Sequence, residues 1–522
     1  MKGAAWSVPV LAIAVAAPAM AISPRDIGLV GIGSFAVQRC GQITGLSFCA
    51  KNGGAAAPAG WTVQVTLPAG LQFASGNPTT QNLTTTAGGC VSVPTIRVTG
   101  AAGSYSITGT ITAPVSGPAG VAQITGTVSV APGNVKEFRT KYTWGDQASA
   151  VTYVRDTALS ASEGGIAGNN AGNSFGAVVA ADGTVRYWTG NTSWTGGTVS
   201  PSTLPTVAGA TQVSTFRANG SAFGGAAASA SAVWQWWDTG SGPTVLAVTG
   251  PTGTVLDVQS FAGRSYVLTT NGVWTWTTAT GGSGGSGGSG SIAATALSLP
   301  AGTAAGSRII QMSAFYDMGN NDTGAAVIIG ASGSATSGQL ALSTGGGNFS
   351  NVTGTGSADI RTVSAGSAGL AAIGTNGTLY TYANYAHAGI PTGWTQRDTG
   401  VSSASVWGFG GYFGGQYVKN GAVVQMFGVS GGYTTKVPTG MTGKTITKTF
   451  SSDGTYLALA SDGTVYYWYG NNDNFSGSGA PAAAVLPGVT NVVDLNVWGY
   501  HYNSGVNNYF GGGFVIQGSG CP

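Results

Sequence analysis

Residues 177–188 read AVVAADGTVRYW, and residues 457–468 read LALASDGTVYYW. Each stretch has a short apolar run, an Asp-Gly pair and a second run that ends in aromatic residues. The apolar runs have the length of buried strands, and Asp-Gly supplies the positive φ values that a two-residue type I′ hairpin needs. The sequence therefore predicts the same β-hairpin at two places that lie far apart in the chain.

Weaker copies of this hairpin surround Asn271-Gly272, Asn376-Gly377 and Asn420-Gly421. From Asp182 to Asp462, successive Asx residues of the five copies are 89, 105, 44 and 42 positions apart. The two long intervals are about twice the short ones. Each long interval should therefore hold one further, degenerate copy.

The best candidates for the degenerate copies are residues 223–237 and 325–342, where apolar and aromatic residues again form two short runs. Hairpins that recur every forty-odd residues, without helical patterning, indicate a β-propeller. At its ends, residues 142–145 look like the outer half of a repeat and residues 514–518 like an inner half, so their pairing would close the ring. We expect a propeller of seven blades over residues 139–522, with eight blades as the alternative.

The best-preserved repeat carries a wider pattern of residues. These residues are Pro438, Gly443, Ile446, Leu457 to Ala460, Asp462 to Val465, Tyr467, Trp468 and Asn471. The pattern resembles the RCC1 repeat, and the resemblance extends over roughly 380 residues of this chain. It is closer in kind to secreted bacterial members, including propellers that resemble a β-lactamase-inhibiting protein, and it implies a protein-binding face. Asp453-Gly454-Thr455 stands where the family often has Gly-x-x-His, and no GQLG follows Asn472, so nucleotide exchange on a GTPase is not expected.

Residues 22–132 have a different pattern, in which short stretches of alternating apolar and polar residues are separated by Gly/Pro turns. This pattern predicts a small antiparallel β-sandwich. Residues 66–76, TLPAGLQFASG, resemble a turn of bacterial immunoglobulin-like surface repeats. The resemblance implies an immunoglobulin-like sandwich, joined to the propeller by a linker at 133–138. The fold class is therefore all-β throughout.

The first 21 residues predict export. Lys2 precedes an Ala-rich apolar run that ends in Ala19-Met20-Ala21, the small-x-small pattern of signal-peptide cleavage. An uncleaved membrane anchor is the alternative, because the run approaches transmembrane length. The four cysteines are Cys40, Cys49, Cys90 and Cys521. An even count in an oxidising compartment favours two disulfides, whose pairing stays open, over a zinc site without C-x-x-C spacing.

Composition excludes several classes of function. Charged residues make up 7% of the 522, the net charge is +3, and no basic run occurs, which argues against a nucleic-acid partner. Gly is abundant at 90 residues, and residues 281–291, GGSGGSGGSGS, have the composition of a flexible linker. We place this stretch as a surface loop or tether within the propeller, with a domain boundary as the alternative.

Catalytic and metal-binding patterns are weak. His387 and His501 lie in aromatic-rich stretches with no nucleophile elbow, so we expect no nucleophilic catalysis. Asp182 and Asp462 are accounted for by turn geometry rather than by a pair of catalytic carboxylates. Residues 317–322 and 471–474 offer oxygen ligands without EF-hand spacing. We expect no cofactor and no metal.

Aromatic residues recur in the second strand of each hairpin, and they are the candidate binding residues. Because side chains alternate across a strand, one of each pair should pack between blades while its neighbour is exposed to stack on sugars or to anchor a protein. The alternative is that all of them are packing residues. The candidates are Tyr187, Trp188, Trp234, Trp236, Trp237, Trp274, Trp276, Tyr380, Tyr466, Tyr467 and Trp468.

Together these patterns predict an exported, monomeric, non-catalytic binding protein of the cell surface or the medium. Its partner would be an extracellular protein or polysaccharide. The alternatives are an inhibitor-like propeller that captures one specific protein and, from another class, a polysaccharide hydrolase or lyase. A fold alone does not choose among them.

Overall fold

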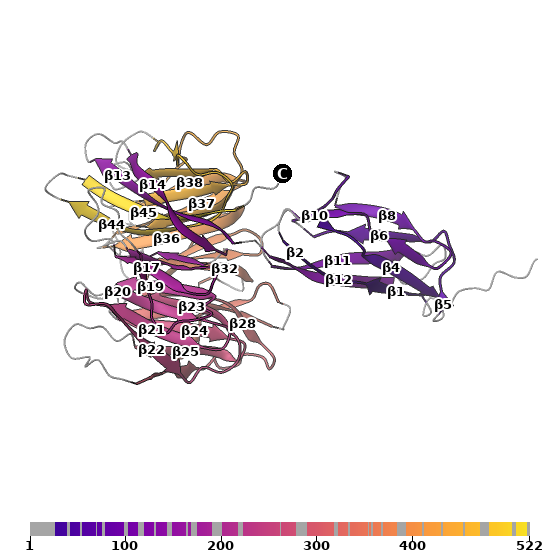
Figure 1. Ribbon diagram of the computed structural model, residues 1–522, viewed down its shortest axis with the longest axis horizontal. Helices are drawn as coiled ribbons and strands as arrows, with labels where there is room; N and C mark the ends of the chain where they lie inside the picture. The colour runs from indigo at the N-terminus through magenta and orange to yellow at the C-terminus, as the bar shows by residue number, and fades with distance from the viewer. Residues whose placement is uncertain are drawn as a thin grey trace, which may run out of the picture. The chain divides into compact units, whose positions relative to one another are not determined.

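The computed structural model describes most of the chain beyond residue 26 and divides it into two compact units, residues 1–130 with 521–522, and residues 131–520 (Figure 1). The described residues form strands and turns and contain no helix. They are 27–38, 42–52, 55–68, 70–75, 79–98, 103–112, 120–129, 132–143, 149–162, 165–168, 175–189, 201–217, 223–261, 263–277, 290–317, 322–331, 335–352, 354–355, 359–366, 369–383, 393–409, 412–429, 432–452, 455–469, 480–503 and 508–518.

The first unit holds three small sheets around one core. The first sheet contains β1 (Ile27–Ile32), β4 (Ser47–Asn52), β5 (Ala55–Ala56) and β9 (Cys90–Ser92). The second contains β3 (Gln42–Ile43), β10 (Ile96–Val98) and β7 (Leu71–Phe73). The third contains β2 (Phe35–Gln38), β12 (Gly120–Ser129), β11 (Gly103–Thr112), β6 (Thr62–Thr66) and β8 (Thr80–Thr84). Their pairing is antiparallel except between β2 and β12, which run parallel.

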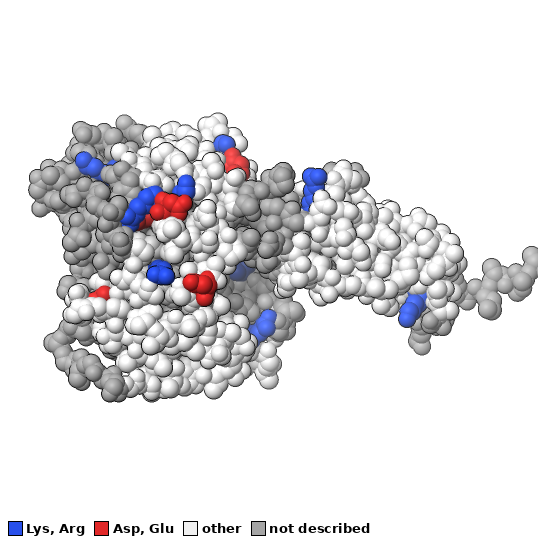
Figure 2. All heavy atoms as spheres, viewed as in Figure 1, with Lys and Arg blue, Asp and Glu red and all other residues white. Residues whose placement is uncertain are grey.

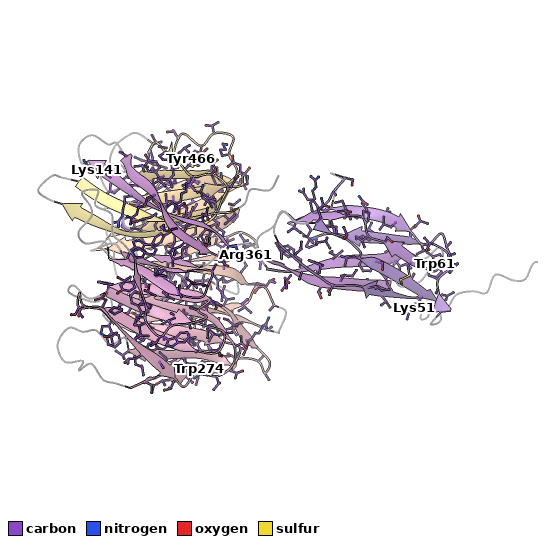
Figure 3. All side chains as sticks on the ribbon, in the orientation of Figure 1. Lys51, Trp61, Lys141, Trp274, Arg361 and Tyr466 are labelled. Carbon is purple, nitrogen blue, oxygen red and sulfur yellow. A yellow bond between two sulfur atoms is a disulfide. The ribbon has the colours of Figure 1, made fainter. Side chains whose placement is uncertain are left out.

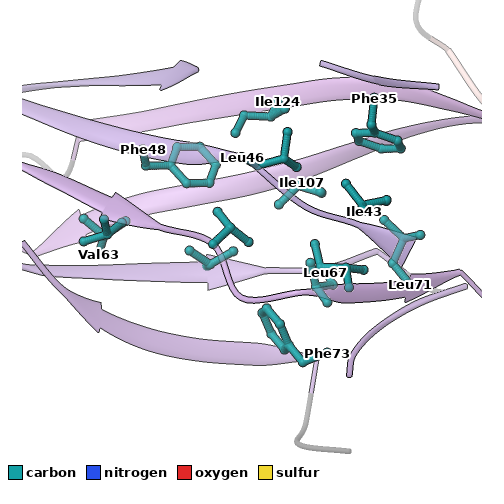
Figure 4. Packing of buried hydrophobic residues seen from close by; sticks show 14 of the residues in the cluster. Phe35, Ile43, Leu46, Phe48, Val63, Leu67, Leu71, Phe73, Ile107 and Ile124 are labelled. Atoms are coloured by element: carbon teal, nitrogen blue, oxygen red, sulfur yellow. The ribbon is translucent and has the colours of Figure 1, made fainter. Parts of the chain in front are cut away.

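Close face-to-face packing makes this unit a sandwich (Figure 4). A Cβ atom at Gly109 of β11 would lie 2.7 Å from the ring of Phe48 in β4, so only glycine lets the two layers approach this closely. Strand β6 alternates between buried and solvent-facing residues, as a strand on one side of a sandwich should. A disulfide joins Cys49 to Cys90 across paired strands β4 and β9, while Cys40 and Cys521 lie outside the described residues.

The second unit is a β-propeller whose described residues form eight sheets, here numbered as blades 1 to 8. Blade 1 is β15 (Ile166–Gly168), β16 (Phe175–Val179), β17 (Val185–Thr189) and β18 (Ser202–Thr203). Blade 2 is β19 (Gln212–Arg217), β20 (Phe223–Ala228), β21 (Val233–Asp238) and β22 (Pro243–Thr249), with β26 (Ile292–Ala293) added at its edge. Blade 3 is β23 (Val255–Phe261), β24 (Arg264–Thr269), β25 (Gly272–Thr277) and β27 (Thr295–Leu297). Blade 4 is β28 (Arg308–Asp317), β29 (Asp322–Gly330), β30 (Gln339–Ser343) and β31 (Ser350–Asn351).

The remaining blades repeat this order. Blade 5 is β32 (Ile360–Gly366), β33 (Gly369–Gly374), β34 (Leu379–Ala383) and β35 (Gly393–Asp398). Blade 6 is β36 (Val401–Phe409), β37 (Tyr412–Lys419), β38 (Ala422–Val429) and β39 (Gly432–Lys436). Blade 7 is β40 (Ile446–Ser452), β41 (Thr455–Ala460), β42 (Val465–Tyr469) and β43 (Ala484–Val485). Blade 8 is β44 (Val492–Asn503), β45 (Asn508–Gln517), β13 (Gly133–Thr143) and β14 (Ser149–Ala161).

The innermost strands of the blades contact one another in a closed series: β44, β15, β19, β23, β28, β32, β36, β40 and again β44. The ring therefore has eight blades among the described residues, which corrects the seven favoured from the sequence. The copy at 325–342, which lacks an Asx-Gly turn, is a full hairpin in β29 and β30. Blade 8 joins the two ends of the unit, because β13 pairs antiparallel with β45 (Figure 1).

Two boundaries differ from those expected. Residues 133–138 are the first half of strand β13 rather than a linker, because their backbone pairs with both β14 and β45. Most of the Gly/Ser stretch 281–291 lies outside the described residues. It follows β25 of blade 3 and precedes β26, which pairs with β22 of blade 2, and then β27, which pairs with β25. The stretch therefore falls within the propeller unit and marks no boundary between the two units.

The Asx-Gly turns also differ from the expected type. Only Asn420 among these Asx residues has a positive φ, at 51°. In the turn after β16, Gly183 has φ 78° and donates its N–H to Ala180 O at 2.8 Å, as in a type I turn that is followed by a glycine bulge. Asp182 keeps a negative φ because its carboxylate accepts the Thr184 N–H at 2.9 Å, which fixes the turn through a side-chain bond.

Blade geometry determines which apolar residues occupy which strand. The second strand of a blade lies near the axis, where neighbouring blades are close, and both its faces are covered, as in β33 and β41, where every residue is buried. Small residues fit there, and the sequence reads as a continuous apolar run. Blades splay apart with distance from the axis, so the third strands fill a wider gap with aromatic residues, as in VYYWY of β42.

Candidate functional site

A cavity of about 550 Å³ lies on the axis of the propeller, because its lining residues come from seven of the eight described inner strands. These strands are β15, β19, β23, β32, β36, β40 and β44. The volume falls in the range of sites that hold small molecules.

The inner strands share a register that makes their lining residues comparable. In β23, β32, β36, β40 and β44 the pairing to the second strand shifts by one residue near the start of the strand. The third residue after the skipped position faces the cavity in each case. The residues at this shared position are Gln259, Ser364, Ser405, Phe450 and Asn496, and Ser214 of β19 matches Ser405 in its hydrogen bonding.

Hydroxyl and amide groups dominate this lining, and several also bond one blade to the next. Ser214 Oγ accepts the Ser260 N–H of the next blade at 2.7 Å. Ser405 Oγ accepts the Ser451 N–H in the same way at 2.9 Å. Asn496 Nδ2 donates to Ile166 O at 3.2 Å. The wall is therefore polar, uncharged over most of its area, and fixed by bonds between blades.

Asp257 of β23 is the charged residue in the described lining of this cavity. Gln259 Nε2 donates to both of its carboxylate oxygens, at 3.2 and 3.1 Å. Burial raises the pKa of Asp257 to about 6, although hydrogen bonds from Gln259 and from the Val258 N–H oppose the rise. The site thus holds a carboxylate in a poorly solvated place, with neutral groups as its partners.

Two further polar atoms on the neighbouring strand β19 are buried without a hydrogen-bond partner among the described residues. They are Thr215 Oγ1, on a side chain that is 6% exposed, and Gln212 Oε1. Both residues line the same cavity. The cavity lining on β19 therefore contains an amide oxygen and a hydroxyl that no described protein group satisfies.

The aromatic residues predicted from the sequence do not form an exposed ring. Nine of the eleven are buried, at 9% exposure or less, and only Trp234 and Trp237 are half-buried. Figure 3 shows Trp274 and Tyr466 among the strands of their blades. The expectation that one of each pair would be exposed was wrong because neighbouring blades cover both faces of the third strand.

Their polar atoms instead join consecutive blades. Trp276 Nε1 donates to Gln235 Oε1 at 2.7 Å, and Trp468 Nε1 donates to Gln425 Oε1 at 3.1 Å. Tyr187 Oη donates to Asp238 Oδ2 at 2.7 Å, and burial together with this carboxylate raises the pKa of the tyrosine. These residues therefore stabilise the ring.

The other sequence candidates are placed as follows. The Asp462 carboxylate accepts hydrogen bonds from Lys444 Nζ at 2.7 Å and from the Thr464 N–H at 3.0 Å. These bonds, that from Lys444 above all, lower the pKa of its carboxyl to about 2. Asp462 therefore stabilises the turn between β41 and β42. His387, the His501 side chain and residues 471–474 lie outside the described part of the chain, as do the side chains of residues 317–322. Within the described residues, no group of three His, Cys, Asp or Glu side chains could hold a metal ion.

Sequence reasoning did not single out Asp257 or Gln259. They stand in VLDVQSF, and the one available signal is a carboxylate within an alternating apolar stretch that is typical of a strand, where Asp is depleted. The charged residues of the described surface are few on the face that Figure 2 shows, where some basic and acidic residues lie together in one mixed group on the propeller. None of the described segments is a helix of the length and apolarity needed to cross a membrane.

Comparison with known proteins adds little to this description. No family model and no curated protein matches the chain. Similar solved structures include human WBSCR16, with 14% identity, a TM-score of 0.41, and 74% of this chain and 100% of that chain covered. Yeast RCC1 (Prp20) bound to Kap60 has 11% identity, a TM-score of 0.37, and 75% and 91% coverage. YCF48 bound to D1 peptide has 13% identity, a TM-score of 0.35, and 62% and 95% coverage. The propeller assignment therefore rests on the sheet topology and the closed ring of this chain.

Proposed function

We propose that the protein is an exported, non-catalytic binding protein whose propeller holds a polar, hydroxyl-rich ligand in its axial cavity. The observation that carries the proposal is the lining, in which hydroxyl and amide groups from six inner strands, those of Ser214, Gln259, Ser364, Ser405, Ser451 and Asn496, surround a space of about 550 Å³. Such groups both donate and accept hydrogen bonds, as a hydroxyl-rich ligand requires.

The lining favours binding over hydrolysis. Glycoside hydrolysis ordinarily uses two carboxyl groups on either side of the bond that breaks. The described lining contributes one, Asp257. A ligand held by this wall would therefore be retained rather than cleaved.

Export is supported by two independent features. The first 21 residues have the pattern of a signal peptide. The Cys49–Cys90 disulfide suits an oxidising compartment, where such bonds persist. The RCC1-like repeat pattern and the immunoglobulin-like character of the first unit belong to the same proposal, that of a surface or extracellular binding protein whose partner is a polysaccharide or a protein.

The test is affinity capture with the full mature chain as bait against culture medium and washed cell walls. Ser364→Phe should block the cavity without unfolding the blade, because Phe450 already occupies the equivalent position of blade 7. Ser350→Phe introduces the same side chain on an exposed residue of the outer strand β31 and serves as the control.

We expect the unaltered chain and the Ser350→Phe variant to enrich one glycan, and the Ser364→Phe variant to lose it. Recovery of one protein by all three baits would show capture on another surface and would contradict an axial site. Cleavage of the captured material by the purified chain would overturn the non-catalytic assignment.

A further inference from the structure

Asp257 and Asp494 occupy the same position in two different blades. Each is the residue at which pairing resumes after the register shift in its inner strand, between Val255 and Asp257 in β23 and between Val492 and Asp494 in β44. The two aspartates can therefore be compared as one position with two different partners.

Asp494 has a cationic partner. Lys448 of β40 places Nζ 3.7 Å from Asp494 Oδ1, and the Leu495 N–H also donates to this oxygen at 2.9 Å. A buried carboxylate is ordinarily accompanied by such a cation, because an unpaired charge is costly to remove from water.

Asp257 has no cationic partner among the described residues. The preceding strand β19 offers Gln212, whose Nε2 donates to the Leu256 carbonyl instead. The described carboxylate contacts come from the Gln259 amide and the Val258 N–H, which are neutral. The strands packed against β23 carry charged residues only at their ends, namely Arg217, Arg264, Arg308 and Asp317.

The described wall of the cavity thus lacks positive charge at Asp257. The Asp257 carboxylate and Gln212 Oε1 are both acceptors, and Gln212 Oε1 is buried without a hydrogen-bond partner among the described residues. We propose that the axial cavity binds an ammonium or guanidinium group of its ligand. This group would pair with the Asp257 carboxylate as the Lys448 ammonium group pairs with the Asp494 carboxylate. This inference rests on the proposed function and specifies its ligand.

The cation can belong to a free small molecule, such as an amino sugar, or to the Lys or Arg side chain of a partner polypeptide. Both present N–H donors on a positive charge to the same carboxylate. A calcium ion is a poorer match, because it takes six to eight oxygen ligands and prefers several carboxylates.

The experiment is isothermal titration calorimetry on the full mature chain at pH 7, where both Asp257 and an amino sugar are mainly ionised. D-glucosamine and D-glucose form a pair of probes that differ at one ammonium group, and acetyl-Gly-Lys-Gly-amide and acetyl-Gly-Arg-Gly-amide, whose ends carry no charge, test the peptide source. We expect glucosamine or a cationic tripeptide to bind at least roughly tenfold more tightly than glucose or acetyl-Gly-Gly-Gly-amide, the size of effect that a charged hydrogen bond contributes. Binding of glucosamine would indicate a free small-molecule amine as the ligand, and binding of a tripeptide would indicate a Lys or Arg side chain.

Asp257→Asn should abolish this preference. Asp494→Asn is the matched control, since it removes the same charge from the same strand position in another blade. If the Asp494→Asn variant fails to fold, Asp359→Asn is the control instead, because Asp359 is an exposed carboxylate just before β32 of blade 5. If glucosamine and glucose bind equally well and the Ser364→Phe variant binds neither, this inference is overturned but the proposed function stands. Binding of CaCl₂ at Asp257 in place of the amines, or no binding of any probe, would also overturn it.

Discussion

Replacement of Asp257 by Asn should stabilise the propeller at neutral pH while it removes a ligand contact. Burial raises the pKa of Asp257 to about 6 in the folded protein, against 3.8 for an unperturbed Asp. The folded state therefore holds this proton more tightly than the unfolded state does, and the free energy of unfolding falls as the pH rises from about 4 to about 6. A difference of two pKa units corresponds to about 3 kcal/mol, which is fully lost above pH 6.

The assay is urea unfolding of the full chain and of the Asp257→Asn variant at pH 4 and pH 8, followed by tryptophan fluorescence. The difference between the two proteins isolates Asp257, because carboxyls with lowered pKa values such as Asp462 contribute equally to both. We expect nearly equal stability at pH 4 and a variant that is up to about 3 kcal/mol more stable at pH 8. A variant that shows the same pH dependence as the original chain, or that is less stable at pH 8, would refute the reasoning.

Three further predictions concern the stability of the fold. Gly463→Ala should destabilise the propeller by about 2–4 kcal/mol in urea titrations, because the residue has φ 78° and a Cβ atom would lie 2.7 Å from the Cα atom of Asn491, just before β44. An unchanged urea midpoint would contradict this. Gln235→Ala should cost about 2–4 kcal/mol, since it leaves the buried Trp276 N–H without its acceptor, and a red shift of the tryptophan emission should accompany the loss. Cys90→Ser should lower the stability of the first unit alone by about 4 kcal/mol, because the Cys49–Cys90 disulfide closes a loop with a sequence separation of 41 residues in the unfolded chain. Calorimetry should then show the unfolding transition of the first unit at a lower temperature and that of the propeller unchanged.

The sequence contained most of the information needed for the fold. The alternation of apolar run, turn and aromatic run indicates a repeated blade. Of the two half-repeats found at the ends, Tyr142 and Thr143 lie on β13 and residues 514–517 lie on β45, and these two strands pair in blade 8. The blade count was uncertain because residues 325–342 keep the apolar runs and lack the turn residues. A blade depends on packing between its neighbours, so a copy can lose its turn signature and still fold.

The binding residues could not be deduced in the same way. Aromatic residues such as Trp468 carry a strong local signal, yet the radial arrangement of blades covers them on both sides. Asp257 carries a weak local signal, and its meaning depends on a comparison with Asp494 that only the register shifts of the inner strands make possible. The chemistry of the cavity is a property of residues spread over the whole ring.

The construction of blade 8 from both ends of the unit also bears on when the protein can fold. Asn134 pairs with Gln517, which lies 383 positions later in the chain, and closing a loop of that length opposes folding by about 5 kcal/mol. The ring cannot close before β44 and β45 (Val492–Asn503 and Asn508–Gln517) have emerged from the ribosome. Until then the blades remain an open array in which β13 lacks its partner β45. An open array can still be unravelled strand by strand, a property that suits the export proposed above.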